Sequence, residues 1–340
     1  MSSSTSADAS PVIVTPLRLG LGSWSAAELF EQYPPQLRDK RKQLLLELAV
    51  AAGPPRGAIE ATRWRAPALE APIAITAPTI ALAAGAFDYA PADAGAQAWW
   101  LNFADAHLFG FYGGPLLAQD ELQVAEHPIL ASVREAFDDA SSAAIQPYTR
   151  DADGATPVLV RGAERRIAID LAPGPGRPRG LYGNHFAATA PDAIRAGVTA
   201  LVPAPAHNIL AIAAPSPGHG IYARATIVDA LTTATGGFAA ARVLSHGDGL
   251  RAIVHTGAWG TGAFGGNKVL MAAVQLIAAR LARLDGLVFH AIGAESIAAF
   301  EEAVTIATTI VPPGATVADP LAIVDALIAH GFRWGVSDGN

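Results

Sequence analysis

A glycine-rich stretch between two apolar segments offers the clearest chemistry in this chain. Residues 256–267 read TGAWGTGAFGGN and contain five glycines. Glycines allow a backbone to approach a ligand closely, and a helix that starts directly after such a loop presents free N–H groups to an anion. A tight turn would need fewer glycines. The stretch therefore predicts a binding loop for a phosphorylated ligand, most naturally a diphosphate.

The segments that flank this loop predict a strand, a helix and a second strand. Residues 251–255 (RAIVH) form the short β-branched run that is typical of a buried parallel strand. Residues 268–284 repeat apolar side chains at helical spacing and carry their arginines late, as helices often do. Residues 286–292 (GLVFHAI) then return as an apolar strand.

The loop also satisfies the fingerprint G-x-G-x-x-G through Gly260, Gly262 and Gly265. In Rossmann domains an acidic residue follows about 20 residues later, at the end of the next strand. Here the acid in that place is Glu295, about 30 residues after Gly265, and Asp285 precedes the strand. A Rossmann dehydrogenase is therefore the runner-up interpretation.

A second stretch, residues 99–121 (WWLNFADAHLFGFYGGPLLAQDE), joins an apolar strand to a helix through an aromatic loop. The first turn of that helix carries Gln119, Asp120 and Glu121. Acids at a helix start complement the helix dipole, which is the simplest explanation of the motif taken alone. In a doubly wound sheet, however, strand-to-helix loops gather at one edge, so both motifs can line one crevice. Together the two stretches favour catalysis.

Composition excludes several classes of protein. The net charge of −7 argues against a broad basic footprint, and no direct binding of nucleic acid is expected. The absence of cysteine excludes a disulfide framework, a thiol nucleophile and a thiolate metal site. The nine histidines lack metal-binding spacing, so neither a metal nor another cofactor is expected.

The chain shows no pattern of a targeting or membrane segment. Residues 1–10 are small and polar, and they lack the basic and apolar regions of a signal peptide. Residues 71–86 are the most hydrophobic stretch, but prolines and threonines interrupt it and it is shorter than the roughly 20 residues that a membrane helix needs. We expect two short buried strands there, no membrane contact and a cytoplasmic protein.

The order of elements predicts a mostly parallel three-layer α/β sandwich. Residues 1–55 are expected to be a disordered start and a helical extension, with helices at 25–33 and 35–51, and residues 56–340 a single larger domain. The other expected elements are strands at 57–62, 72–76, 79–83, 156–160, 166–171 and 209–213, helices at 116–137 (broken at Pro128), 190–200 and 221–243 (interrupted at 236–237), and a covering loop at 173–189.

Residues 256–289 resemble the C-terminal part of poly(ADP-ribose) glycohydrolases. That family carries a T-G-N-W-G-C-G-A-F-G-G-D loop, a helix bearing lysine and glutamine, and a strand that ends in an aromatic residue. Residues 102–105 (NFAD) resemble the D-F-A-N or N-F-A-S segment of the family, and residues 119–121 (QDE) stand where its Q-E-E signature belongs. Residues 158–164 (VLVRGAE) are similar to the strand that follows. The resemblance covers roughly residues 70–305.

The resemblance implies a macrodomain-like α/β/α sandwich with a mixed, mostly parallel sheet and a cleft for ADP-ribose. It implies an ADP-ribosyl glycohydrolase that cleaves an O-glycosidic bond of the distal ribose, with Glu121 as the acid/base and Asp120 in place of the first glutamate. The expected partner is ADP-ribose or ADP-ribosylated protein. The substrate-binding residues implied are Asn102, Asp105, Gln119, Gly257, Trp259, Gly260, Thr261, Gly262, Ala263, Phe264, Gly265 and Asn267.

Several departures from the family pattern keep two other functions open. Residues 109–111 (FGF) replace three consecutive glycines of the family, and Asn267, Thr261 and Ala258 replace an aspartate, a cysteine and an asparagine. The bulk of Phe109, Phe111 and Tyr112 is expected to disfavour internal cleavage of long polymer. The chain could instead be an ADP-ribose-binding module without turnover, or a hydrolase of a small metabolite derived from ADP-ribose or a nucleotide.

Four aromatic residues are candidates for stacking on the ligand. Phe264, between Ala263 and Gly265, is expected to face the ligand, whereas a core position is favoured for Trp259. Tyr182 and Phe186 could form a replacement wall for the adenine.

Overall fold

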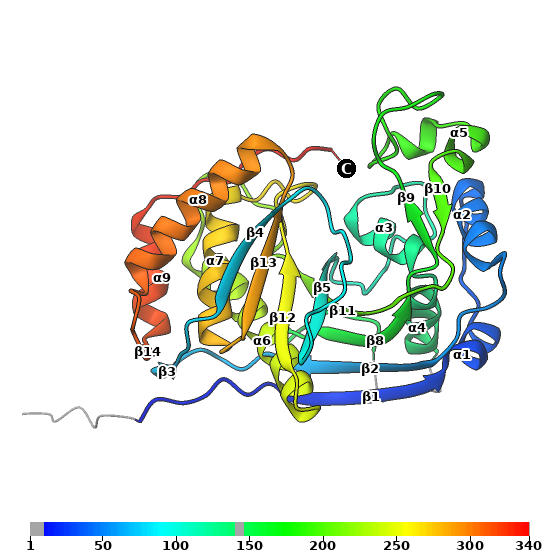
Figure 1. The fold of residues 1–340 in the computed structure, drawn as a ribbon. Helices are drawn as coiled ribbons and strands as arrows, with labels where there is room; N and C mark the ends of the chain where they lie inside the picture. Colours follow the sequence, from blue (N-terminus) through cyan, green and yellow to red (C-terminus); the bar gives the residue numbers. More distant parts are fainter. Residues whose placement is uncertain (1–9, 140–145, 340) are drawn as a thin grey trace, which may run out of the picture.

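An eight-stranded mixed sheet forms the centre of the computed structural model, which describes residues 10–139 and 146–339 (Figure 1). The strand order is β1-β2-β8-β11-β5-β12-β13-β4. In that order the strands are β1 (Leu17–Ser25), β2 (Ala58–Arg65), β8 (Val158–Glu164), β11 (Ala206–Ala213), β5 (Ala96–Ala104), β12 (Arg251–Thr256), β13 (Gly286–Ala291) and β4 (Thr79–Ala84).

The part of the sheet that carries both motifs is parallel. Strands β11, β5, β12, β13 and β4 pair in parallel, whereas β1, β2 and β8 form an antiparallel arm next to β11. Because β5 and β12 are parallel neighbours, the loops that follow Ala104 and Thr256 leave the sheet at the same edge. The predicted meeting of the two motifs therefore has a structural basis.

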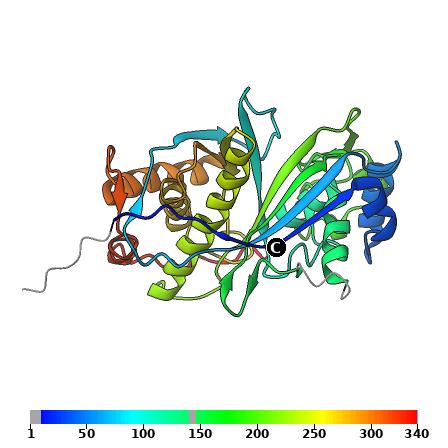
Figure 2. The ribbon, with the colours of Figure 1, turned by 90° about the horizontal axis from the view of Figure 1, so that it is seen from below.

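Helices cover both faces of the sheet, as Figures 1 and 2 show from two directions. Neighbouring side chains of β5 point to opposite faces of the sheet. Trp99 and Leu101 pack with the helices α6 to α9, whereas Trp100 packs with α1, α3 and α4. This alternation is the period of two that a strand imposes on its side chains. The predicted three-layer α/β/α sandwich with a macrodomain-like, mostly parallel mixed sheet is confirmed.

The helices are α1 (Ala26–Gln32), α2 (Lys40–Val50), α3 (Gln119–Glu126), α4 (Ile129–Asp138), α5 (Pro191–Arg195), α6 (Arg224–Gly247), α7 (Lys268–Leu281), α8 (Gly293–Ile310) and α9 (Pro320–Ala329), with a 3-10 turn at Phe186–Ala188. The short strands are β3 (Ile73–Ala74), β6 (Arg150–Asp151), β7 (Gly154–Ala155), β9 (Ile167–Ile169), β10 (Val198–Ala200) and β14 (Val317–Ala318). None of the helices in the described ranges has the length and apolar character that crossing a bilayer requires.

Two predicted helices differ from the structure. The helix expected at 190–200 ends at Arg195, and Val198–Ala200 instead pairs with β9 as strand β10, in keeping with the strand preference of β-branched residues. The interruption expected at 236–237 is absent, because α6 runs through both glycines. A Cβ atom at Gly236 would lie 2.4 Å from the Cβ of Ala66, so this glycine permits close packing against the chain after β2.

Two stretches of the N-terminal third also differ from expectation. Residues 17–24, for which no element was predicted, form the edge strand β1 together with Ser25, which was expected to begin a helix. Within residues 71–86 both short strands form, but β4 is the opposite edge of the sheet and is largely exposed instead of buried. The break expected at Pro128 is confirmed, since α3 ends at Glu126 and α4 begins at Ile129.

Three histidines, His207, His255 and His290, pack against Trp100 on one face of the sheet, and His127 packs against His207. His127 Nε2 lies 3.1 Å from His207 Nδ1, and His255 Nδ1 lies 3.0 Å from His290 Nε2. The ring of His255 stacks on Trp100 with centroids 3.8 Å apart. Burial lowers the pKa of all four, to about 4 for His207 and His255. His255 is thus a packing residue of the sheet.

These neutral histidines predict a fold that loses stability in mild acid. Histidines of the unfolded chain titrate near pH 6.5, so between pH 6.5 and about 4 the unfolded state binds more protons than the folded state. Each such group should add a slope of up to about 1.4 kcal/mol per pH unit to the decline in unfolding free energy. Urea unfolding from pH 7.5 to 4.5 measures this. His255→Phe should flatten the slope, and the exposed control His219→Gln should leave it unchanged; equal slopes in all three proteins would contradict the assignment.

Candidate active site

The side chain of Gln119 fixes the start of α3 against the end of β5. Its Oε1 accepts a hydrogen bond from the backbone N–H of Phe103 at 2.7 Å, and its Nε2 donates to the carbonyl of Leu101 at 3.0 Å. Both hydrogen-bonding groups of the amide are therefore engaged by the strand. Gln119, which the sequence placed among the substrate contacts, positions the two acids that follow it.

Asp120 is a buried carboxyl held by Asn102. The side chain is 7% exposed, and Oδ1 accepts a hydrogen bond from Asn102 Nδ2 at 3.0 Å. Asn102 is fully buried, and its Oδ1 has no hydrogen-bond partner among the described residues. Burial, followed by the like charge of Glu121, raises the pKa of Asp120 well above its ordinary value.

Glu121 is also buried, at 3% exposure, and it caps its own helix. Its Oε2 accepts a hydrogen bond from the backbone N–H of Ala118 at 3.1 Å. Burial raises the pKa of Glu121, while the positive charge of Lys42 opposes this rise. Asp105 lies in the same neighbourhood, where its charge adds to the rise at both acids and its Oδ1 accepts from the N–H of His107 at 3.0 Å.

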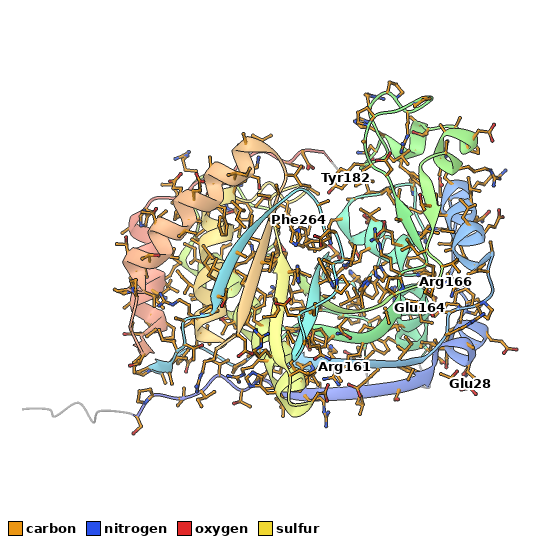
Figure 3. The ribbon with its side chains drawn as sticks, in the orientation of Figure 1. Glu28, Arg161, Glu164, Arg166, Tyr182 and Phe264 are labelled. Atoms are coloured by element: carbon orange, nitrogen blue, oxygen red, sulfur yellow. The ribbon has the colours of Figure 1, made fainter. Side chains whose placement is uncertain are left out.

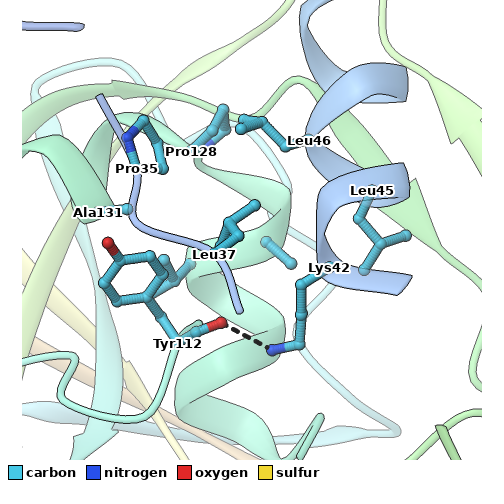
Figure 4. Close-up of a pocket in the computed structure, with 10 residues that line it drawn as sticks. Pro35, Leu37, Lys42, Leu45, Leu46, Tyr112, Pro128 and Ala131 are labelled. Carbon is cyan, nitrogen blue, oxygen red and sulfur yellow. Dashed lines mark hydrogen bonds between the residues drawn. The ribbon is translucent and has the colours of Figure 1, made fainter. Parts of the chain in front are cut away.

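Lys42 is a buried cation from α2 that acts on both acids and that no sequence motif marks. Its side chain is 2% exposed, and Nζ donates to the carbonyl of Tyr112 at 3.2 Å (Figure 4). The ammonium also lies 5.8 Å from the ring centroid of Phe186. Burial lowers the pKa of Lys42 to about 8, and the charges of Glu121 and Asp120 oppose this. In the sequence Lys42 belongs to a charged run that looks like an exposed helix start.

The segment before α2 is tied to the loop that follows β5. The N–H groups of Arg38 and Asp39 both donate to the carbonyl of Gly113, and the N–H of Gln36 donates to Tyr112 Oη at 2.6 Å. The expected helical extension thus packs on the loop that leads into α3. Between them a pocket is lined by Pro35, Leu37, Lys42, Leu45, Leu46, Tyr112, Val124, Ala125, Pro128 and Ala131 (Figure 4).

The aromatic loop places less bulk at the surface than its sequence predicts. Phe109 is fully buried in a left-handed backbone conformation, with φ at 51°. Tyr112 is buried too, and its hydroxyl donates to Glu135 Oε1 at 2.7 Å. Only Phe111 of the three is exposed, at 53%. The expectation that all three obstruct a polymer is therefore wrong for Phe109 and Tyr112, which serve the core.

The glycine loop runs from β12 to α7 and leaves backbone donors open at its tip. Gly260 and Gly265 have positive φ values of 74° and 63°, which explains glycine at both positions. Within the described residues, the N–H groups of 262, 263 and 264 donate to no acceptor. Asn267 caps α7, since its Oδ1 accepts from the N–H of Leu270 at 3.0 Å. Three successive free donors beside a helix start are suited to an anion.

Buried side chains of the loop and of α7 hold the loop in place through hydrogen bonds. Trp259 is fully buried, and its indole N–H donates to the carbonyl of Ile212 at 3.2 Å, so the favoured core position is its actual one. Thr261 Oγ1 donates to the carbonyl of Ala258 at 3.0 Å. Gln275 Nε2 on α7 donates to the carbonyl of Gly257 at 3.1 Å. Trp259 and Thr261 of the predicted site residues are therefore support positions, and Gln275 of α7 supports the loop at Gly257.

Tyr182 lies near Glu121 because its loop is bound to Leu117, two residues before α3. The N–H of Gly183 donates to the carbonyl of Leu117 at 2.9 Å. Burial, then the charges of Asp338 and Glu121, raise the pKa of Tyr182 to about 12. Figure 3 shows Tyr182 and the half-buried Phe264 at the same end of the sheet. Phe186 is fully buried against α2, so the expectation that it walls an adenine is wrong.

The part of the candidate site that contains the glycine loop matches a known protein family. Residues 188–299 match the family described as "Poly (ADP-ribose) glycohydrolase (PARG), Macro domain fold". This range contains β11, α6, β12, the glycine loop, α7 and β13. A search of curated protein sequences finds no match.

Solved structures of two glycohydrolases and one macrodomain are similar to this chain at low sequence identity. The poly(ADP-ribose) glycohydrolase of Thermomonospora curvata shares 17% identity over 92% of this chain and 94% of its own, with a TM-score of 0.38. That of Deinococcus radiodurans in complex with ADP-ribose shares 16% over 85% and 96%, with a TM-score of 0.38. A macrodomain of Oceanobacillus iheyensis shares 14% over 69% and 96%, with a TM-score of 0.36.

The sequence match and the architecture agree with each other. The matched range supplies three of the parallel strands and the loop between β12 and α7, and these elements form the part of the sheet next to β5. Over residues 188–299 the chain is similar to the poly(ADP-ribose) glycohydrolase family, which has a macrodomain fold.

Proposed function

We propose that this protein is an ADP-ribosyl glycohydrolase that cleaves the O-glycosidic bond of the distal ribose, with Glu121 as the acid/base. The observation that carries the proposal is the placement of two buried carboxyls at the start of α3. This helix follows β5, the neighbour of the strand β12 that leads into the glycine loop. The family match supports ADP-ribose as the ligand class. The glycohydrolases and macrodomain with similar folds are consistent with it.

The tip of the glycine loop would hold the diphosphate of the ligand. The free N–H groups at 262–264 are donors of the kind that phosphate oxygens accept from, and α7 starts directly after the loop. With the diphosphate there, the distal ribose would extend toward the edge of the sheet where α3 begins. Tyr182 and Phe264 stand at the same end and would border the ligand.

Hydrolysis of a glycosidic bond requires a proton for the leaving oxygen, stabilisation of an oxocarbenium-like centre and a positioned water. A carboxyl whose pKa is raised by burial can first donate that proton and then accept one from water. Glu121 has this property. Asp120, which Asn102 holds beside Glu121, would influence the reaction electrostatically.

A binding module without turnover is the alternative that one specific contact favours. Glu121 accepts a hydrogen bond from Ala118 N–H, which is the contact expected of a carboxylate that only caps its helix. A hydrolase of a small ADP-ribose-derived or nucleotide-derived metabolite is a third candidate, because Phe111 still presents bulk at the loop surface. Assays on mono- and poly-ADP-ribosylated protein distinguish these functions.

Replacement of Glu121 separates enzyme from binder. Glu121→Gln should keep ligand affinity and lose turnover by about 100-fold or more, the usual scale for removal of a positioned acid/base. Asp120→Asn should cost less, because its role is electrostatic. The exposed Glu47→Gln on α2 serves as the control and should change nothing. If Glu121 only caps α3, the variant should lose up to about 1 kcal/mol of stability and retain full turnover.

A charged side chain at the tip of the glycine loop should abolish ligand binding. Gly262→Glu places bulk and negative charge beside the free N–H groups, and calorimetry with ADP-ribose should then detect no binding. Gly247→Glu adds the same side chain at the exposed end of α6, where a Cβ meets no atom within 4 Å, and should bind as the wild type does. Equal affinity in the two variants would exclude the loop as the diphosphate site.

Removal of the buried Lys42 charge should shift the pH dependence of turnover. Lys42 lowers the pKa of Glu121, so Lys42→Met should raise that pKa and keep Glu121 protonated to higher pH. The alkaline limb of the pH profile of kcat should therefore move to higher pH. Lys42→Arg retains the charge and should keep the wild-type limb. A lower kcat with an unshifted limb in Lys42→Met would mean that Lys42 is only a packing residue.

A further inference from the structure

The segment 333–339 lies directly on the glycine loop. The N–H of Gly335 donates to the carbonyl of Gly265 at 2.8 Å, and the N–H of Asp338 donates to the carbonyl of Gly262 at 3.4 Å. Asn267 Nδ2 donates to the carbonyl of Arg333 at 3.1 Å. Three positions of the segment thus contact the loop that is proposed to hold the diphosphate.

The beginning of this segment is anchored to the body of the protein. Trp334 stacks on Tyr222, with ring centroids 4.2 Å apart and planes 10° from parallel. The backbone N–H of Trp334 donates to the carbonyl of Gly220 at 2.9 Å. Any movement of the segment would therefore begin after Trp334, at Gly335.

Beyond Gly335 the segment crosses from the glycine loop toward the loop that borders α3. A Cβ atom at Gly262 would lie 3.0 Å from Asp338 Oδ2, which places the carboxylate at the tip of the glycine loop. Asn184 Nδ2 donates to the carbonyl of Gly339 at 2.6 Å. In Figure 1 the end of the chain, marked C, accordingly lies between the α8 side and the loops near β9.

We propose that residues 335–339 form an occluding segment that occupies the diphosphate position, with the Asp338 carboxylate as an internal anion. The segment must leave the loop before a phosphorylated ligand binds. This inference rests on the proposed function only in assigning the diphosphate to the glycine loop. It adds a regulatory contact: the closed form seen here excludes the ligand, and only the open form binds it.

The occluding segment has the physical properties of a displaceable element. All five residues are exposed, including the apolar Val336 at 90%, so little apolar burial holds the segment down. Gly335 and Gly339 give it backbone freedom at both ends, and Gly339 has a φ of 78°. A diphosphate would bring negative charge beside the Asp338 carboxylate, and this repulsion favours release of the segment.

The closed form imposes a measurable penalty on affinity. When only a fraction of the molecules is open, the apparent Kd rises by the reciprocal of that fraction. Removal of the segment should therefore tighten binding, and removal of its charge alone should shift the equilibrium in the same direction. A segment that instead contacts the bound ligand would have the opposite effect.

The test compares ADP-ribose binding by calorimetry in the full chain, in a chain that ends at Trp334, and in Asp338→Asn. We expect Kd to fall by about threefold or more in both altered proteins, following the open-fraction relation. Glu28→Gln on the exposed face of α1, far from the loop in Figure 3, removes the same charge and should leave Kd unchanged. Unchanged or weaker binding in the shortened chain and in Asp338→Asn would overturn the occlusion.

Hydrogen exchange provides a readout that does not depend on turnover. Saturating ADP-ribose or inorganic pyrophosphate should increase exchange at the N–H groups of Gly335 and Asp338, because both lose their carbonyl acceptors on the loop. Unchanged or greater protection would overturn the proposal, even if the shortened chain failed to fold. If neither the full nor the shortened chain binds ADP-ribose, the proposed function fails together with the occlusion. Binding without release of the segment refutes the occlusion alone.

Discussion

The parallel pairing of β5 with β12 is the constraint on which the candidate site depends. In this pairing the register runs from Arg251 opposite Ala96 to His255 opposite Trp100, so the two strands run in one direction and end at one edge of the sheet. The polypeptide therefore brings a loop with free N–H groups and a helix start with two carboxyls to adjacent strand ends. Had either strand been reversed, the two motifs would lie at opposite edges and no common site would form.

The same arrangement creates an electrostatic problem that the rest of the fold resolves. Two adjacent carboxyls taken out of water are costly unless hydrogen bonds or a cation compensate them. Asn102 donates to Asp120, the N–H of Ala118 donates to Glu121, and Lys42 contributes a buried positive charge. The cation comes from α2, so the N-terminal helices have a part in the site as well as in packing. Compensation is incomplete, which leaves both carboxyl pKa values raised.

The glycine loop is held firmly where it leaves the sheet, but the backbone donors at its tip are unoccupied by any described acceptor. Trp259 and Gln275 hold its lower side, through hydrogen bonds to Ile212 and from α7 to Gly257. The N–H groups at the tip, in contrast, have no acceptor in the described part of the chain, and the segment 335–339 lies over them. Under the proposed occlusion, the internal carboxylate of Asp338 and the ligand would compete for this tip.

The sequence by itself determined many of the local elements, because hydrophobic period, glycine clusters and proline breaks act over a few residues. The strand–loop–helix–strand unit at 251–292, the break at Pro128 and the pair of acids at the start of α3 were all predictable. Only the tertiary structure decided which residues share the site. Lys42 belongs to an ordinary charged run, Phe109 looks like bulk in a substrate loop, Phe186 resembles a ligand-stacking aromatic, and Asp338 carries no motif. Their positions follow from packing between segments far apart in the chain, and burial of a side chain against a distant segment leaves no periodic signal in the sequence.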